Sequence, residues 1–298
     1  MTCSSSRSLF RFGLLGACIL AVAATTWPVP ADAQDANALR SRHTSLRDKF
    51  ATNQFGRPLA LESAQSSGDL KGDVYAVVDH PFAAVQQSLS SPEHWCDILI
   101  LHLNVKRCKV AAGGKMLSVN VGRRFDQPLE DAYLFDLAYK VASTSADYLL
   151  VQLTADEGPM NTRDFRIVVE AIGVDARRSM LHMSYAYGYG MTARLAMQAY
   201  LATVGRDKVG FTVLEQKPDG KPVYRGGVLG LLERNTMRYY LAIDAYLAAH
   251  ALPAGEQTER RLREWYSSTE RYAPQLREME QADYLDMKRK EIKRQHAG

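Results

Sequence analysis

The sequence predicts an α+β fold in which a curved antiparallel sheet wraps around one long helix towards the C-terminal end. Most segments between residues 104 and 187 alternate apolar and polar residues with a period of two, and short turns join them. Such short connections are typical of antiparallel hairpins, because parallel strands need long crossovers. An apolar stripe then indicates a long helix over residues 227–249.

Composition limits the function before any motif is considered. The chain has 298 residues, of which 46% are hydrophobic and 23% are charged, so it can bury a sizeable core. Its formal net charge of +4 is small, and no basic face interleaved with aromatic residues is present in the sequence. This argues against a dedicated nucleic-acid binder. The histidines and cysteines lack the spacing of metal sites, so we expect no metal and no other cofactor.

Residues 1–33 have the pattern of a secretory signal peptide. Arg7 and Arg11 precede an apolar run over residues 12–24, and the small-x-small site that ends at Ala33 follows. The run is shorter than the roughly 20 residues that span a bilayer. We therefore expect cleavage after Ala33 and an exported, periplasmic protein of Gram-negative type. Cys18 lies in a sequence like a lipoprotein box, but the apolar run continues beyond it, so lipid anchoring is the less favoured alternative.

Two cysteines, Cys96 and Cys108, remain after such a cleavage. An even number of cysteines in an oxidising compartment favours a disulfide. Closing a loop of this size would stabilise the fold by roughly 3 kcal/mol. Two buried free thiols are the alternative.

The mature chain begins with a polar segment, residues 34–56, which we expect to be a linker or a lead-in helix. Extended runs over residues 58–63 and 73–79 come next, and residues 82–89 have the single apolar face of a short helix. The alternating segments of the sheet then cover residues 104–110, 115–125, 132–143, 148–155, 165–174 and 180–187.

The C-terminal third returns mainly to helix. Residues 191–203 are helix formers, and residues 209–215 are expected to form a final strand. The long helix over residues 227–249 follows. Residues 251–298 are dense in charged side chains, which predicts a helical extension with a solvated face. We therefore expect one ligand-binding domain over residues 57–250.

Residues 158–165 read Gly-Pro-Met-Asn-Thr-Arg-Asp-Phe. This resembles the Pro-x-x-x-Arg-Asp-Phe motif at the start of a central strand in START (steroidogenic-acute-regulatory-related lipid-transfer) domains. With the order of elements, it makes residues 68–250 similar to the START-like, helix-grip superfamily, here in a bacterial exported form. The resemblance implies a tunnel for a sterol, a phospholipid or another apolar molecule, and a largely structural role for Arg163 and Asp164. Val169 stands where some sterol-binding relatives carry an inward arginine, so the ligand class stays open.

Physical reasoning about the interior leads to the same expectation. One helix stripe cannot fill a curled sheet, and the remaining volume becomes a cavity lined by inward side chains. Plain core packing is the alternative for each of these residues taken singly. The expected lining residues are Phe165, Ile167, Val169, Leu181, Met183, Tyr185, Phe211, Leu232, Tyr239 and Ile243.

These features predict binding and transport of a lipid or another hydrophobic small molecule, with transient contact to a membrane surface, rather than catalysis. A protein-interaction module with a filled cavity is one alternative. Residues 187–205, where glycines precede a helix, are the candidate gate, and a rigid packed insertion is the other interpretation of that segment. A cavity enzyme of the polyketide cyclase or aromatase type also stays open. Its acid–base candidates are Asp136, Asp147, Glu170 and His182.

Overall fold

The computed structural model describes Met1 and residues 35–203 and 205–297. The expected signal peptide and its cleavage site lie outside the described residues. Within them, no helix has both the length and the apolar character needed to cross a bilayer.

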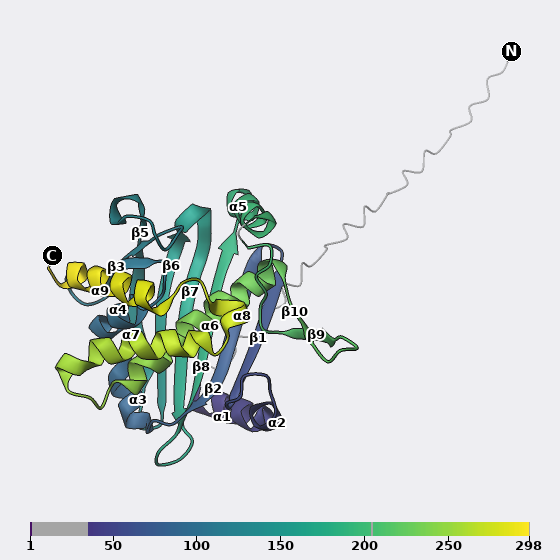
Figure 1. Cartoon of the computed structure of the whole chain (residues 1–298). Coiled ribbons are helices and arrows are strands. Elements are labelled where there is room, and N and C mark those ends of the chain that lie inside the picture. The colour runs from purple at the N-terminus through teal and green to yellow at the C-terminus, as the bar shows by residue number, and fades with distance from the viewer. Residues whose placement is uncertain (2–34, 204, 298) are drawn as a thin grey trace. The chain divides into compact units, whose positions relative to one another are not determined.

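A large antiparallel sheet forms the centre of the fold (Figure 1). In the part of the chain that the structure describes, eight strands make up this sheet in the order β1-β2-β8-β7-β6-β5-β4-β3. The α+β class and the curved antiparallel sheet predicted from the alternating segments are confirmed. The strands are β1 (Leu59–Ser66), β2 (Asp69–Val78), β3 (Val105–Val110), β4 (Met116–Val121), β5 (Tyr133–Thr144), β6 (Tyr148–Gly158), β7 (Thr162–Gly173) and β8 (Ser179–Tyr189).

The long helix α6 (Gly227–Ala248) packs on the concave face of this sheet, as predicted (Figure 1). It crosses β2 at very close range, because Gly72 has no side chain there. A Cβ added to Gly72 would lie 2.2 Å from the Oγ1 atom of Thr236. The helices α3 (Phe82–Leu89) and α4 (Pro92–Leu99) also contact α6.

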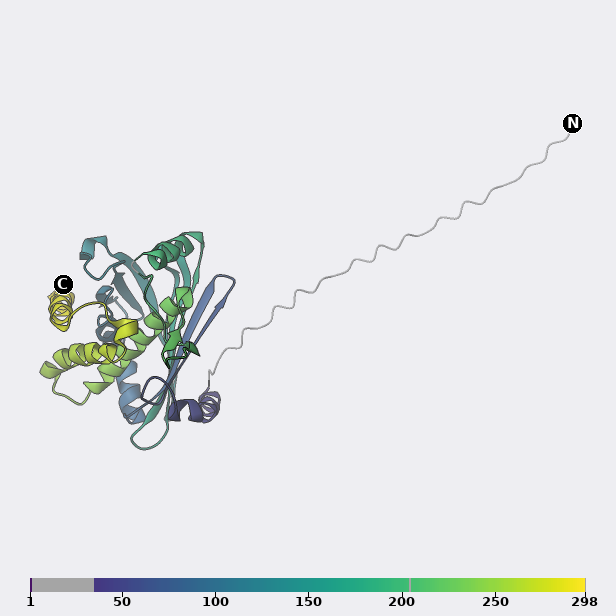
Figure 2. The ribbon, with the colours of Figure 1, turned by 45° about the vertical axis from the view of Figure 1, so that its right-hand side comes forward.

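The convex face of the sheet is covered as well. Residues 36–51 form α1 (Ala36–Ser45) and α2 (Arg47–Ala51), which lie across the sheet from α6 in Figure 2. Leu39 and Leu46 are fully buried against Tyr75 and Tyr148 of the strands. The lead-in segment is therefore a packed layer, which helps to explain why the strands are rich in apolar residues on both faces.

A buried polar cluster of Asp73, Tyr148, Glu170 and His182 lies in this convex layer. The Nδ1 atom of His182 is 2.7 Å from a carboxylate oxygen of Glu170, and its Nε2 atom is 2.9 Å from one of Asp73. The hydroxyl of Tyr148 donates to Glu170 at 2.5 Å. The ring of Tyr75 stacks on His182 with centroids 4.3 Å apart.

The C-terminal segment packs into the same core as the sheet. It forms α7 (Ala254–Glu270), α8 (Ala273–Leu276) and α9 (Gln281–Ala297). Trp265 and Tyr284 are buried in the main hydrophobic core. The charged residues do form a solvated face, but the opposite face of these helices completes the core.

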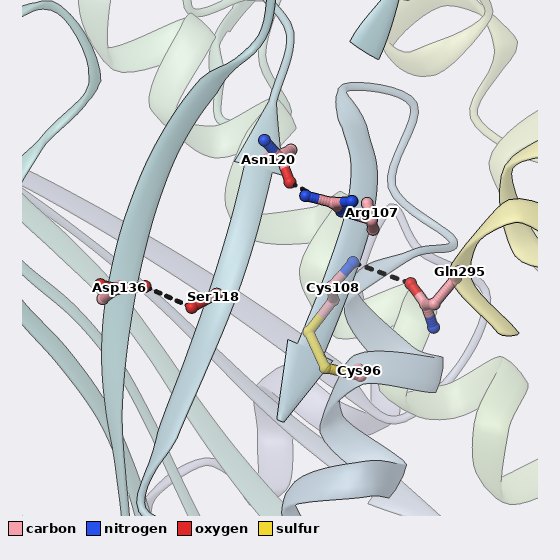
Figure 3. The surroundings of a disulfide bond; sticks show 7 residues. All are labelled: Cys96, Arg107, Cys108, Ser118, Asn120, Asp136 and Gln295. Atoms are coloured by element: carbon pink, nitrogen blue, oxygen red, sulfur yellow. Dashed lines mark hydrogen bonds between the residues drawn. A yellow bond between two sulfur atoms is a disulfide. The ribbon is translucent and has the colours of Figure 1, made fainter. Parts of the chain in front are cut away.

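The predicted disulfide between Cys96 and Cys108 is confirmed, and it joins α4 to β3 with Cα atoms 5.1 Å apart (Figure 3). Because β3 is an edge strand, its backbone needs other hydrogen-bond partners. The side chain of Gln295 in α9 accepts a bond from the Cys108 amide at 2.8 Å (Figure 3). The buried ammonium of Lys288 donates to the Val105 carbonyl at 2.8 Å. Helix α9 therefore covers this edge.

The final strand predicted over residues 209–215 is confirmed in part. Residues 213–215 lie in β9 (Val213–Gln216), which pairs with β10 (Pro222–Tyr224) in a separate hairpin rather than with the main sheet. Residues 209–212 do not form a strand. The amide of Gly210 donates to the Arg225 carbonyl at 2.6 Å, and the carboxylate of Glu233 in α6 accepts from the amides of Phe211 and Thr212, at 2.6 and 2.9 Å.

Candidate functional site

A cavity of about 240 Å³ lies between the concave face of the sheet, helix α6 and the short helix α5 (Met191–Ala202). The strands β4, β5, β7 and β8 supply its walls, and the loop between α4 and β3 closes one side. Its lining residues are His102, Asn104, Val121, Gly122, Arg123, Tyr133, Phe135, Pro159, Thr162, Phe165, Tyr185, Tyr187, Ala193, Met197, Leu231, Asn235 and Tyr239.

The cavity wall is formed by a chain of aromatic rings. Tyr185 and Tyr187 are two residues apart on β8, so both point to the concave face. Their ring centroids are 5.4 Å apart, and Tyr185 is 5.2 Å from Tyr239 and 5.4 Å from Phe165. Phe135 packs edge-on against Phe165 at 5.4 Å. Because each ring is held by its neighbours, the wall is largely pre-formed.

Part of the cavity lining next to Tyr239 is polar and carries an imidazole. His102 is 5% exposed, and its ring stacks on Tyr239 with centroids 4.8 Å apart. Its Nδ1 atom accepts a hydrogen bond from the Asn104 amide at 3.2 Å. Burial, followed by the positive charges of Arg238 and Lys288, lowers the pKa of His102 well below 6.5. The imidazole is therefore neutral at physiological pH.

The tyrosine hydroxyls of the cavity also stay protonated. Burial raises the pKa of Tyr187 to about 12, and it also raises the pKa of Tyr185 and of Tyr239. Among the residues that the structure describes, no carboxylate lines this cavity. The site therefore offers aromatic surface and neutral hydrogen-bonding groups, with Arg123 as a cation at its rim.

Three of the ten predicted lining residues border this cavity: Phe165, Tyr185 and Tyr239. The other seven lie in the main hydrophobic core and do not border it. Phe211 packs between Phe55 and Tyr272 instead, 5.7 and 5.5 Å away. The remaining core residues are Ile167, Val169, Leu181, Met183, Leu232 and Ile243.

The motif pair Arg163–Asp164 has a structural role. Arg163 forms an ion pair of 3.1 Å with Asp69 and so links the beginning of β7 to the beginning of β2. Asp164 has φ of +51°, and the β7–β8 register shifts between Arg163 and Arg166. The motif therefore produces a bulge that redirects the strand where it enters the cavity wall.

None of the four acid–base candidates borders the cavity. Asp136 is exposed and accepts a hydrogen bond from Ser118, and Asp147 is exposed and pairs with Arg40. Glu170 and His182 belong to the buried polar cluster on the convex face. Strand periodicity places Glu170 and His182 on the face away from the cavity, since even-numbered residues of β7 and β8 point away from α6.

The candidate gate, residues 187–205, contains α5. Ala193 and Met197 of this helix border the cavity, whereas Met191 and Leu195 are 68% and 58% exposed. Gly188 is needed for close packing, because a Cβ there would lie 2.8 Å from both Arg163 and Asp69. Whether the segment opens stays a prediction.

A wider groove of about 690 Å³ lies on the surface between residues 125–130 and α9. Charged side chains of both signs line it, and several of them neutralise one another. Lys290 pairs with Asp286 at 2.6 Å, and Lys106 pairs with Glu291 at 3.0 Å. The smaller aromatic cavity is the better candidate for an apolar ligand.

No family profile and no curated protein matches this sequence. Solved structures do match. A START superfamily protein from Mycobacterium smegmatis is 10% identical with a TM-score of 0.29, and the match covers 46% of this chain and 92% of that chain. Human StAR-related lipid transfer protein 5 is 8% identical with a TM-score of 0.32, over 56% of this chain and 89% of that chain. A point mutant of norcoclaurine synthase from Thalictrum flavum is 13% identical with a TM-score of 0.33, over 48% and 93%. The START superfamily, which residues 158–165 resemble, is thus among the matches.

Proposed function

We propose that this protein binds a small hydrophobic molecule in the cavity between the sheet, α5 and α6, and that it carries this molecule after export to the periplasm. The observation that supports the proposal is the cavity itself. Its wall is aromatic, its polar groups are neutral apart from Arg123 at the rim, and its rings are held in place before a ligand arrives. This is the usual make-up of a small-molecule site.

The size of the cavity limits the ligand. Its volume of about 240 Å³ lies just below the roughly 300–1,000 Å³ typical of ligand pockets. A compact ring compound, or the ring end of a longer lipid, fits this volume. A whole phospholipid requires α5 to move outward, because Ala193 and Met197 of α5 form part of the wall.

Carriage of a lipid also requires contact with a membrane. Exposed apolar side chains lie beside the cavity, with Met191 and Leu195 on α5 and Leu134 on β5. Helix α5 and strand β5 both contact the turn η2 (Pro159–Asn161), so these side chains lie at the same end of the fold. We propose that this end touches the bilayer transiently while the ligand is exchanged.

Ligand binding can be tested with a pair of matched variants on α5. Ala193 is buried and borders the cavity, whereas Ala199 on the same helix is exposed and does not border it. Phenylalanine at position 193 adds a ring to the cavity, and the same change at position 199 adds it to the surface. The probe is N-phenyl-1-naphthylamine, a neutral apolar fluorophore.

We expect 1:1 binding to the unmodified protein, at least tenfold weaker binding to Ala193→Phe, and binding within twofold of the unmodified protein for Ala199→Phe. Native mass spectrometry of the gently purified protein identifies any co-purified ligand. A folded Ala193→Phe variant that binds the probe like the unmodified protein contradicts the proposal.

Membrane contact is tested separately by co-sedimentation with anionic phospholipid vesicles. The double variant Met191→Gln/Leu195→Gln should lose most vesicle binding. Leu214→Gln is the control, because Leu214 is 59% exposed on β9, outside the cavity rim. Equal loss in both variants contradicts a docking role for this end of the fold.

A further inference from the structure

The polar side of the cavity contains a buried hydrogen-bonding group without a protein partner. The Nε2 atom of His102 is inaccessible to solvent, and among the described residues nothing forms a hydrogen bond with it. Buried polar groups in folded proteins nearly always have a partner. Because His102 borders the cavity, a ligand bound there is the candidate for this partner.

The bonding of the other ring nitrogen identifies Nε2 as a donor. Nδ1 accepts from the Asn104 amide at 3.2 Å, so it must present its lone pair. A neutral imidazole then carries its one proton on Nε2. Because burial lowers the pKa of His102, this neutral form is the one present near pH 7.

Asn235 adds a second donor to the same wall. Its Oδ1 atom accepts from the Arg238 guanidinium at 3.4 Å, which leaves the amide Nδ2 group as the part free to donate. Arg238 is itself oriented by Glu278, with a separation of 2.6 Å. A side-chain interaction with Asn235 raises the pKa of His102, so the Asn235 amide lies beside the imidazole, although no bond with hydrogen-bond geometry reaches Nε2.

We propose that His102 and Asn235 together bind an acceptor oxygen of the ligand, such as the carbonyl of a ketone, ester or quinone, while the ligand's ring packs on Tyr185 and Tyr239. This inference depends on the proposed ligand-binding function and makes it more specific. It assigns the ligand to the class of compact ring compounds that carry a carbonyl oxygen. A pure hydrocarbon leaves both donors unsatisfied and binds less tightly for that reason.

The test uses two probes of the same shape. In 2-acetylnaphthalene a carbonyl oxygen occupies the place of the methylene group in 2-isopropenylnaphthalene. Each probe competes with N-phenyl-1-naphthylamine for the cavity. We expect the ketone to bind the unmodified protein about tenfold more tightly, which corresponds to about 1.4 kcal/mol.

Variants of His102 separate hydrogen bonding from packing. His102→Phe keeps a ring against Tyr239 but removes the donor, so the preference for the ketone should fall to less than twofold. His102→Gln places an amide near the position of Nε2 and should restore much of the preference. His94→Phe is the matched control, because His94 also packs on an α6 tyrosine, Tyr246, but lies outside the cavity.

The outcomes distinguish the two proposals. If the fluorophore does not bind the unmodified protein, the ligand-binding function itself is wrong. If the fluorophore binds but neither probe displaces it, the acceptor-oxygen assignment is overturned. If both probes bind equally, or if His102→Phe keeps the full preference, the cavity binds ligands but the acceptor-oxygen assignment is overturned. Should His102→Phe fail to fold, Asn235→Leu provides the same comparison, with an expected loss of at least threefold in the preference.

Discussion

The buried polar cluster on the convex face leads to a prediction about stability. His182 bridges the carboxylates of Asp73 and Glu170, and all three side chains are buried. Replacing His182 with leucine removes both bridging bonds and leaves two carboxylates close together. Removing one partner of a buried charged pair typically costs 3–5 kcal/mol.

Other contacts reduce the expected loss. Glu170 keeps the hydroxyl of Tyr148 as a donor at 2.5 Å, and Asp73 keeps an ion pair of 3.4 Å with Lys71. We therefore expect His182→Leu to lower the free energy of unfolding by about 3 kcal/mol, the lower end of that range. For a domain of this size, this corresponds to a melting temperature lower by roughly 6–12 °C.

The pH dependence of the loss follows from the two pKa shifts. Burial lowers the pKa of His182, but the hydrogen bonds to Asp73 and Glu170 outweigh this and raise it above 6.5. A raised pKa stabilises the fold below pH 6.5, and this contribution disappears as pH rises through the folded-state pKa. For Asp73, burial raises the pKa, but bonding to His182 lowers it below 3.8, so its contribution disappears in acid.

The assay is urea unfolding of both proteins at a series of pH values, with the Cys96–Cys108 disulfide kept oxidised. The difference in unfolding free energy should be largest between about pH 4 and pH 6.5 and should shrink above that range. His43→Leu is the control, because His43 lies on α1 over the same face and contacts Phe50 rather than a carboxylate. A loss below 1 kcal/mol, or a difference that grows above pH 7, refutes the reasoning.

Three further changes test the packing of the fold. Gly72→Ala should lower the unfolding free energy by about 1–3 kcal/mol, because the added methyl group overpacks against Thr236. In urea titrations, the double variant Gly72→Ala/Thr236→Ala should recover part of this loss, and no recovery contradicts the contact. Reducing the disulfide between Cys96 and Cys108 should cost roughly 3 kcal/mol for a separation of 12 residues, measured with and without dithiothreitol, and an unchanged urea midpoint excludes this contribution. Asp164→Val should cost about 1–2 kcal/mol because φ is +51°, while Asp164→Gly should melt within about 2 °C of the unmodified protein; equal losses contradict a backbone cause.

The parts of the fold that depend on local pattern could be predicted from the sequence. The alternating segments predicted the strands, and the apolar stripe from Leu229 to Leu247 predicted α6. The error over residues 209–212 has a different origin. An extended segment reads the same whether its amides bond to a strand or to a carboxylate, and Glu233 is twenty or more residues away from the amides it binds.

The convex layer left a signal in the sequence. Tyr148, Leu150, Glu170 and His182 project from the outer face of β6, β7 and β8, and an outer face exposed to water would not favour so many large or apolar residues. A sheet buried on both faces needs a second covering layer. Residues 34–56 were the remaining segment that could form this covering layer. Their helices are too polar for the sequence of this segment alone to predict that they pack on the sheet.

His102 could not be identified as a site residue from the sequence. It lies in a loop without periodicity, between α4 and β3, and its position depends on packing that joins distant segments. Helix α9 holds this loop from behind, since the Lys288 ammonium donates to the His102 carbonyl at 2.6 Å. The interaction spans 186 residues of sequence, beyond the reach of any local pattern.

The residue types along the strands nevertheless change where the solid core ends and the cavity begins. On the concave face, β8 carries Leu181 and Met183 in the packed core and Tyr185 at the point where the cavity begins. On α6 the same change runs from Ile243 to Tyr239. Branched and flexible aliphatic side chains fill space between a sheet and a helix, whereas rigid rings held edge to edge leave gaps that they cannot fill. A change from aliphatic to aromatic residues along neighbouring elements therefore indicates which end of such a fold receives a ligand.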